Sequence, residues 1–243
     1  MGQHVLLNNV DHHDLRLVIR HGAAFGDAVN QALVFPSEYQ DIQRHYPIFF
    51  RRTEDGGFKS VALLGFDRDE NLFLDGETWN AAYIPAMHQV GPFLIGQPKA
   101  APGQALPADA EAMILVDADH VRISRSEGEA LFLPQGGNSP ALGHVTRILQ
   151  QVYAGAQTSD RMFAAFIEAG LLAPIEIEVK VNDTQSFRLN DMFTVSVDAL
   201  RSLDGEALHA LNQTGFLPLA FSVVSSMGNL SHMIDLKNGR NAA

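Results

Sequence analysis

The sequence contains no cysteine, and it carries only one tryptophan among 243 residues. The absence of cysteine excludes disulfide bonds, thiolate metal ligands and a cysteine nucleophile. Fifteen phenylalanines and four tyrosines still supply large apolar side chains, and hydrophobic residues make up 46% of the chain. This composition is typical of a globular protein and not of a disordered or fibrous one.

Basic residues are scarce. The chain has 17 lysines and arginines against 28 aspartates and glutamates, which gives a net charge of −11. No basic cluster is larger than the pair Arg51-Arg52. An acidic surface repels phosphate backbones and anionic lipid headgroups. We therefore expect no nucleic-acid partner, and we interpret the negative charge as a contribution to solubility.

Long apolar runs are also missing. The longest stretch without Asp, Glu, Lys or Arg is 207–234, and polar residues, Gly215 and Pro218 interrupt it. A membrane-spanning helix needs about 20 predominantly apolar residues. The segment Met1–Asn9 lacks basic residues, and the polar run 11–14 follows it, which argues against a secretory signal. The sequence predicts no membrane insertion and a cytoplasmic location.

Helix signals occur in four places, each opened by a serine or aspartate that can cap a helix. The predicted helices cover 37–45, 140 to about 153, 159 to 170, and 204 to about 213. The second of these has the strongest start, because Ser139 is followed by Pro140 at the first helical position.

Short apolar runs bounded by turn residues predict strands. They cover 5–7, 15–19, 48–51, 60–66, 71–74, 93–96, 113–116, 121–124, 175–181 and 193–197. The turn 53–57 predicts a hairpin, as does the turn 117–119. Because regular βαβ alternation is absent, we predict an α+β fold with a mainly antiparallel sheet, several short strands and about four helices. We expect a single domain over 1–243, with a subdivision near 100–110 as the alternative.

A His-x-Asp spacing occurs at His12 and Asp14. It could supply two ligands of a facial triad for non-haem iron, with His144 or His232 as the third. The alternative is a polar turn in which Asp14 caps the chain or pairs with Arg16. With ten histidines in the chain, such a match arises easily by chance. We therefore expect no metal or other cofactor, and a metal-dependent enzyme using His12 and Asp14 remains the alternative function.

Aromatic residues alternate with prolines in the first half of the chain. Tyr46, Trp79 and Tyr83 stand among Pro47, Pro85 and Pro92. Such residues can build a rigid groove for a peptide or sugar, or they can fill a core. Turn signals lie on both sides of the segment that holds Trp79 and Tyr83. We expect these two side chains to border a concave surface, with the indole N–H and the phenol O–H free to meet a ligand.

His88 lies close to Tyr83 in the sequence, and a histidine titrates near neutral pH. It therefore joins Tyr46, Trp79 and Tyr83 as a candidate ligand-binding residue. No serine or carboxylate stands beside it with the spacing of a known catalytic motif, and we assign no catalytic residue.

Several stretches together resemble the SapC-like family of bacterial proteins, over essentially the whole chain. They are 13–16, 35–36, 45–50, 64–66, 70–74, 79, 82–86, 92–96, 193–195 and 208–229. One departure is the run 88–91 (His-Gln-Val-Gly), where the family usually carries basic residues. We therefore do not expect this run to bind anions in the way that the basic residues of the family could.

The resemblance implies an accessory role linked to bacterial surface layers or to outer-membrane receptor systems, and it brings no catalytic residues. A peptide-transporter permease that carries the same name is unrelated. This chain lacks the membrane-spanning segments that a permease needs. We expect a non-catalytic accessory or binding protein that recognises a protein partner or a glycan through the aromatic–proline surface. A purely structural assembly protein is a further alternative, and a homo-oligomer is left open.

Overall fold

The computed structural model describes residues 4–96, 113–182 and 185–242. The strands are β1 (His4–Leu6), β2 (Arg16–Leu17), β3 (Gln31–Val34), β4 (Ile48–Arg52), β5 (Phe58–Leu63), β6 (Leu74–Asp75), β7 (Thr78–Trp79), β8 (Phe93–Gly96), β9 (Met113–Asp117), β10 (Ile123–Ser124), β11 (Glu129–Ala130), β12 (Leu172–Asn182) and β13 (Gln185–Val195). The helices are α1 (Tyr39–Ile42), α2 (Ala86–Val90), α3 (Pro140–Glu168), α4 (Val197–Arg201), α5 (Gly205–Gln213), α6 (Leu217–Ser226) and α7 (Asn229–Ala242), with 3-10 turns η1 (Ala23–Phe25) and η2 (Pro36–Glu38). The predicted α+β class is confirmed.

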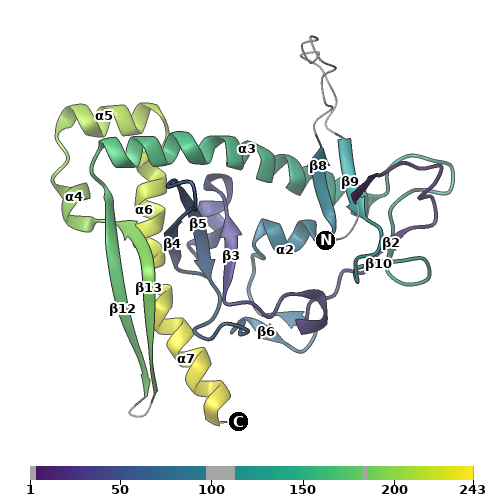
Figure 1. Cartoon of the computed structure of the whole chain (residues 1–243), viewed down its shortest axis with the longest axis horizontal. Helices are drawn as coiled ribbons and strands as arrows, with labels where there is room; N and C mark the ends of the chain where they lie inside the picture. Colours follow the sequence, from purple (N-terminus) through teal and green to yellow (C-terminus); the bar gives the residue numbers. More distant parts are fainter. Residues whose placement is uncertain (1–3, 97–112, 183–184, 243) are drawn as a thin grey trace.

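The largest sheet has five strands in the order β12-β13-β4-β5-β3, and every neighbouring pair is antiparallel. The predicted β4–β5 hairpin is confirmed, and its turn closes with a hydrogen bond of 3.0 Å from Thr53 N to Gly57 O. The long β12–β13 ribbon stands at one end of the molecule in Figure 1. The predicted strand 175–181 lies in β12, but its expected partner 193–197 is wrong. Residues 175–180 pair with 186–192, residues 193–195 pair with 172–174, and Val197 already begins α4.

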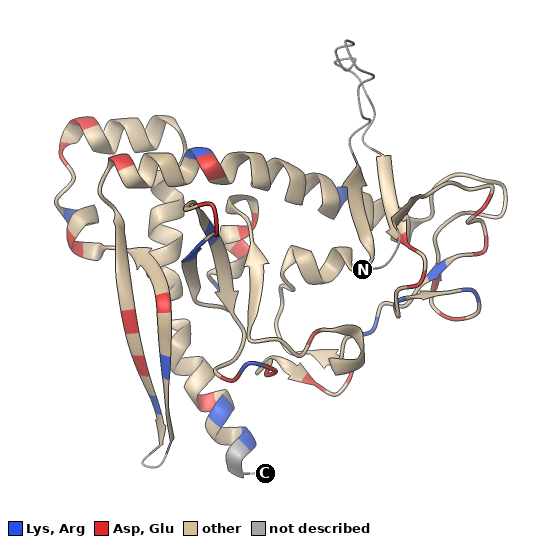
Figure 2. Ribbon diagram, viewed as in Figure 1, with Lys and Arg blue, Asp and Glu red and all other residues tan. Residues whose placement is uncertain are grey.

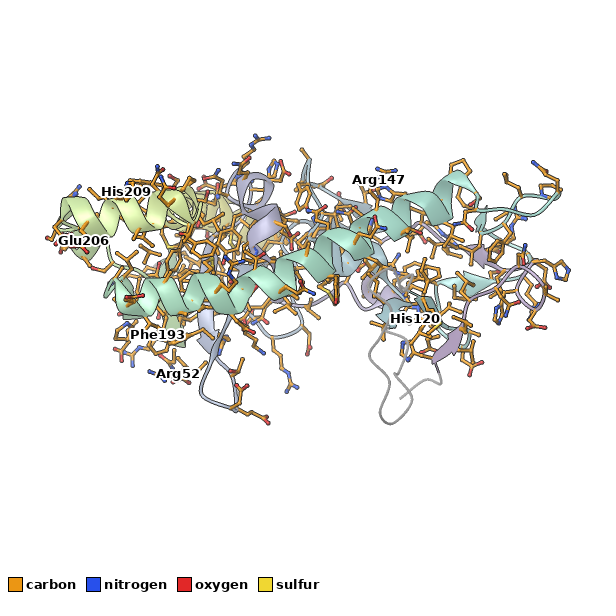
Figure 3. All side chains as sticks on the ribbon, turned by 90° about the horizontal axis from the view of Figure 1, so that it is seen from above. Arg52, His120, Arg147, Phe193, Glu206 and His209 are labelled. Atoms are coloured by element: carbon orange, nitrogen blue, oxygen red, sulfur yellow. The ribbon has the colours of Figure 1, made fainter. Side chains whose placement is uncertain are left out.

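Helix α3 runs along the molecule above the sheets and joins its two halves (Figures 1 and 3). Its start follows the predicted signal, since Ser139 Oγ accepts a hydrogen bond of 3.2 Å from Leu142 N and Pro140 occupies the first turn. Near its other end Phe163 packs edge-on against Phe50 of β4, with ring centroids 5.0 Å apart. Figure 3 shows α5 alongside this end, with Arg52 and Phe193 on the opposite flank.

Buried apolar side chains form two clusters, and α3 contributes to both. The larger cluster contains the main sheet, α6 and the second half of α3, including Phe166. The smaller one gathers α2, β8, β9 and the first half of α3, including Leu142 and Val145. Helix α3 therefore connects the two clusters. The alternative domain boundary at 100–110 lies outside the described residues.

Several predictions of local structure were wrong. Ser37 does not cap a helix over 37–45, because it lies inside η2, and α1 ends at Ile42. Ser159 does not begin a helix, because α3 continues through it without a break and the serine Oγ donates a 3.0 Å hydrogen bond to Gly155 O. Strands β9 and β10 do not form a hairpin. Instead β9 lies between β1 and β8, while β10 pairs with β2. The turn between them is real, but each strand finds its partner elsewhere in the chain.

Two helices near the carboxyl end, α6 and α7, were not predicted from the sequence. Pro218 lies in the first turn of α6, where a proline costs no intrahelical hydrogen bond.

Acidic side chains are spread over β12, β13, α4 and α5 (Figure 2). Within the part of the chain that the structure describes, no helix combines the length and the apolar character needed to cross a membrane.

Candidate functional site

The carboxylate of Asp27 is the centre of a buried polar network. Asp27 follows the short turn η1, and its side chain is only 2% exposed. Oδ1 accepts a hydrogen bond of 3.0 Å from His88 Nδ1. Oδ2 accepts from His21 Nδ1 at 3.2 Å, from Gly22 N at 2.9 Å and from an Arg122 terminal nitrogen at 2.7 Å. Three separate stretches of chain therefore meet on one carboxylate.

The network keeps Asp27 ionised. Burial by itself raises the pKa of the carboxyl. Hydrogen bonds from His21, His88 and Gly22 N, together with the charge of Arg122, lower this pKa by more than burial raises it. The net result is a pKa of Asp27 well below its usual range. The charge of Arg122 is compensated in the same way, because its guanidinium donates to Asp27 and to the backbone oxygen of Arg20 and lies 4.9 Å from the centre of the Phe25 ring.

The ionised carboxylate fixes the protonation of the two imidazoles. A carboxylate can only accept hydrogen bonds, so His21 and His88 must both carry a proton on Nδ1. In the neutral form of each ring the lone pair then lies on Nε2. Both rings also pack against the indole of Trp79, with centroids 5.5 Å away for His21 and 5.1 Å for His88. Hydrogen bonds and ring contacts together hold the two imidazoles in one orientation.

A pocket of about 300 Å³ lies beside this network. Its polar lining includes His21, His88 and Arg122, and its apolar lining includes Leu17, Ile84 and Val145. The pocket is bordered by α2, by the first turns of α3 and by the segments around β2 and β10. Such a combination of aliphatic walls with a few fixed polar groups is the usual character of a small-ligand site.

A second buried carboxylate, Glu38, holds helix α2 in place. Its Oε2 accepts 2.9 Å hydrogen bonds from Ala86 N and from Tyr83 Oη, and its Oε1 accepts one of 3.0 Å from Phe35 N. Burial outweighs these bonds, and the pKa of Glu38 is raised. Because Ala86 is the first residue of α2, this contact fixes the helix that presents His88 to the pocket.

Of the four predicted ligand-binding residues, only His88 lines this pocket. Tyr46 and Trp79 are buried in the larger core, and Tyr83 packs against it. The expectation of free polar groups is wrong. Trp79 Nε1 donates to Tyr46 Oη at 2.7 Å, Tyr46 Oη donates to the backbone oxygen of Tyr83 at 2.6 Å, and Tyr83 Oη is bound to Glu38. Polar groups that leave water need such partners, and the core supplies them.

The His12–Asp14 pair makes only local and surface contacts. His12 Nδ1 accepts a hydrogen bond of 3.2 Å from Asn8 N, and Asp14 forms an exposed ion pair with Arg125 instead of the expected Arg16. His144 lines the pocket described above, whereas His232 is exposed on α7, with its ring centroid 6.3 Å from that of Phe73. Among the described residues, no three histidine or carboxylate side chains are grouped so that they could hold a metal ion.

The residues that sequence reasoning missed are His21, Asp27, Glu38 and Arg122. The sequence separates Asp27 from His88 by 61 positions and from Arg122 by 95. No spacing rule joins residues that far apart. The one local signal is the pair of glycines at 22 and 26, both with positive φ, which marks a tight turn that folds His21 back toward Asp27.

The network lies within the region covered by a protein-family model. The model of the SapC family matches residues 7–233, which is nearly the whole chain. The chain belongs to the SapC family. The resemblance proposed from the sequence motifs is thereby confirmed, and all members of the Asp27 network lie inside the SapC match. No curated protein and no solved structure matches the chain.

Proposed function

We propose that this member of the SapC family is a non-catalytic binding protein whose ligand occupies the pocket beside Asp27. The observation that carries the proposal is the pairing of an aliphatic pocket with two imidazoles that a buried carboxylate holds in place. Ordering polar side chains in advance reduces the entropy lost on binding. A carboxylate with four donors is a costly arrangement to bury, and a binding site gives it a use.

The proposal moves the site away from the aromatic–proline surface expected from the sequence. Tyr46 and Trp79 have a structural role next to the site. They are joined by a hydrogen bond in the core, and the indole of Trp79 packs against both imidazoles. The volume of the pocket suits a compact group. Such a group is a free small molecule, or one residue or sugar unit that projects from a protein partner or a glycan. The accessory role beside surface-layer or receptor systems and the cytoplasmic location remain part of the proposal, and cell fractionation tests the location.

A variant that fills the pocket tests the proposal. Ala141 lines the pocket in the first turn of α3, so Ala141→Phe should block it without removing any partner of Asp27. Ala154 lies exposed on the same helix, and Ala154→Phe is the matched control. A library of small organic fragments is screened against the wild-type protein by ligand-observed NMR.

We expect fragments that bind the wild-type protein and Ala154→Phe to lose binding to Ala141→Phe, with unchanged circular dichroism. Fragments that bind all three proteins equally would place the site elsewhere. A screen without any bound fragment, followed by unchanged partner capture by Ala141→Phe, would rule the pocket out as the binding site.

A further inference from the structure

The chemistry of the pocket narrows the class of ligand. Nδ1 of His21 and of His88 is bound to Asp27. The second ring nitrogen of each, Nε2, takes no part in these hydrogen bonds. Neither Nε2 has a hydrogen-bond partner among the described residues, and neither is sealed from solvent. Both rings line the pocket. In their neutral form they offer two lone pairs to whatever enters it.

The arginine and the amide side chain that line the pocket are already engaged. Arg122 is paired with Asp27 and with the Arg20 carbonyl oxygen, so its charge is balanced within the protein. The amide nitrogen of Gln89, which also lines the pocket, donates to the Ile84 carbonyl oxygen. Glu129 adds an exposed carboxylate to the lining. Arg122 therefore offers no uncompensated charge to an anionic ligand, and the two Nε2 atoms and Glu129 give the pocket a surplus of acceptors even though His144 can donate.

We infer that the pocket takes a ligand with an aliphatic body and a hydroxyl or amine head, whose hydrogens are donated to Nε2 of His21 and His88. The aliphatic lining by Leu17, Ile84 and Val145 suits the body of such a ligand. A ligand that displaces water from the pocket but lacks a donor would leave these acceptors unsatisfied, and this discriminates against it. This inference rests on the proposed binding function and assigns its ligand class.

Three probes of the same chain length separate the classes: butanol, butylamine and butyrate. They are titrated into the full chain at pH 8. Long-range ¹H–¹⁵N NMR spectra report which nitrogen of each imidazole carries the proton. We expect Nδ1 to be the protonated nitrogen of His21 and His88, and butanol or butylamine to shift the Nε2 signals of both rings. Butyrate at the same concentrations should leave them in place.

The variant His88→Phe keeps a ring at this position and removes the acceptor. We expect it to weaken binding of the amine and alcohol probes by about 5-fold, the effect of one hydrogen bond of about 1 kcal/mol. His209→Phe is the control, since His209 is exposed on α5 and does not line the pocket. If His88→Phe fails to fold, the wild-type spectra alone still decide the proton positions and the probe preference.

The outcomes separate this inference from the proposed function. Butyrate binding that is equal or tighter, and that Ala141→Phe blocks, would overturn the ligand class and leave the pocket as the binding site. A proton on Nε2 in place of Nδ1 would overturn it as well. If none of the three probes binds, both this ligand class and the use of the pocket lose their support.

Discussion

The indole Nε1 of Trp79 donates a hydrogen bond of 2.7 Å to the phenol oxygen of Tyr46, and both side chains are buried. This bond is the first in a series of hydrogen bonds that runs from the core to the start of α2 beside the pocket. Tyr46 Oη passes a hydrogen bond on to the backbone of Tyr83, and Tyr83 Oη reaches Glu38, which holds the first residue of α2. The aromatic segment thus has a structural role next to the pocket.

Replacing Trp79 by alanine should cost about 3–5 kcal/mol of unfolding free energy, because it removes a large buried ring from the core. Phe221→Ala is the control, since Phe221 is 52% exposed and little buried area is lost there. Urea denaturation followed by circular dichroism measures both. Equally small losses in the two variants would show that Trp79 is not a core residue.

Tyr46→Phe keeps the ring and removes one oxygen. The indole N–H of Trp79 and the backbone oxygen of Tyr83 then both lack a partner in the protein. An unsatisfied buried polar group costs about 1–3 kcal/mol, and we expect a loss of that size in urea denaturation. A variant as stable as the wild type would mean that water replaces both bonds.

Asp27→Asn should destabilise the protein by about 3–5 kcal/mol at neutral pH, because the buried guanidinium of Arg122 loses its counter-charge. The pH dependence has a definite sign. The pKa of Asp27 is lowered in the folded protein, so the unfolded chain takes up its proton first, near pH 4. The stabilisation by the carboxylate is present above that pH and is lost as pH falls below it.

The advantage of the wild type over Asp27→Asn should therefore shrink between pH 5 and pH 3, as measured by urea denaturation at each pH. Asp75→Asn is the control, because Asp75 is exposed on β6 and its replacement should change little at any of these pH values. A wild-type advantage that stays constant or grows as pH falls would contradict the lowered pKa.

Glu38 should show the opposite trend. Its pKa is raised in the folded protein, chiefly by burial, so the folded state holds the proton more tightly than the unfolded chain does. The stabilisation is then largest below the unfolded value of about 4.3 and declines as pH rises above it. Relative to Glu38→Gln, which cannot ionise, the wild type should lose stability between pH 4 and pH 7. A wild type that gains stability over this range would show that the pKa is lowered.

Two glycines of α3 form a matched pair. A methyl group added at Gly155 would lie 2.5 Å from Ser37 Oγ and 2.6 Å from Phe35 Cβ, whereas one at Gly143 meets nothing within 4 Å. We expect Gly155→Ala to destabilise the protein by about 1–3 kcal/mol through overpacking. Gly143→Ala should stabilise it by about 0.5–1 kcal/mol, because alanine favours helix. Thermal and urea unfolding measure both, and equal effects would contradict the close approach of η2 to α3.

Local structure was largely readable from the sequence. The start of α3 at Ser139-Pro140 and the hairpin β4–β5 depend on hydrogen bonds and backbone preferences of neighbouring residues, which the sequence displays directly. The predicted hairpin of β9 and β10 failed although its turn residues were suitable. Strand pairing depends on which partner buries the same apolar face, and β9 buries its face between β1 and β8.

The sequence alone determined the absence of thiol chemistry, the acidic charge, the α+β class and the family to which the chain belongs. Only the tertiary structure decided that Trp79 and Tyr46 are core residues and that Asp27 gathers His21, His88 and Arg122. The physical reason is that burial and the choice of hydrogen-bond partner are set by packing between segments far apart in the chain. A carboxylate in a loop looks the same in the sequence whether it faces water or an arginine 95 residues away.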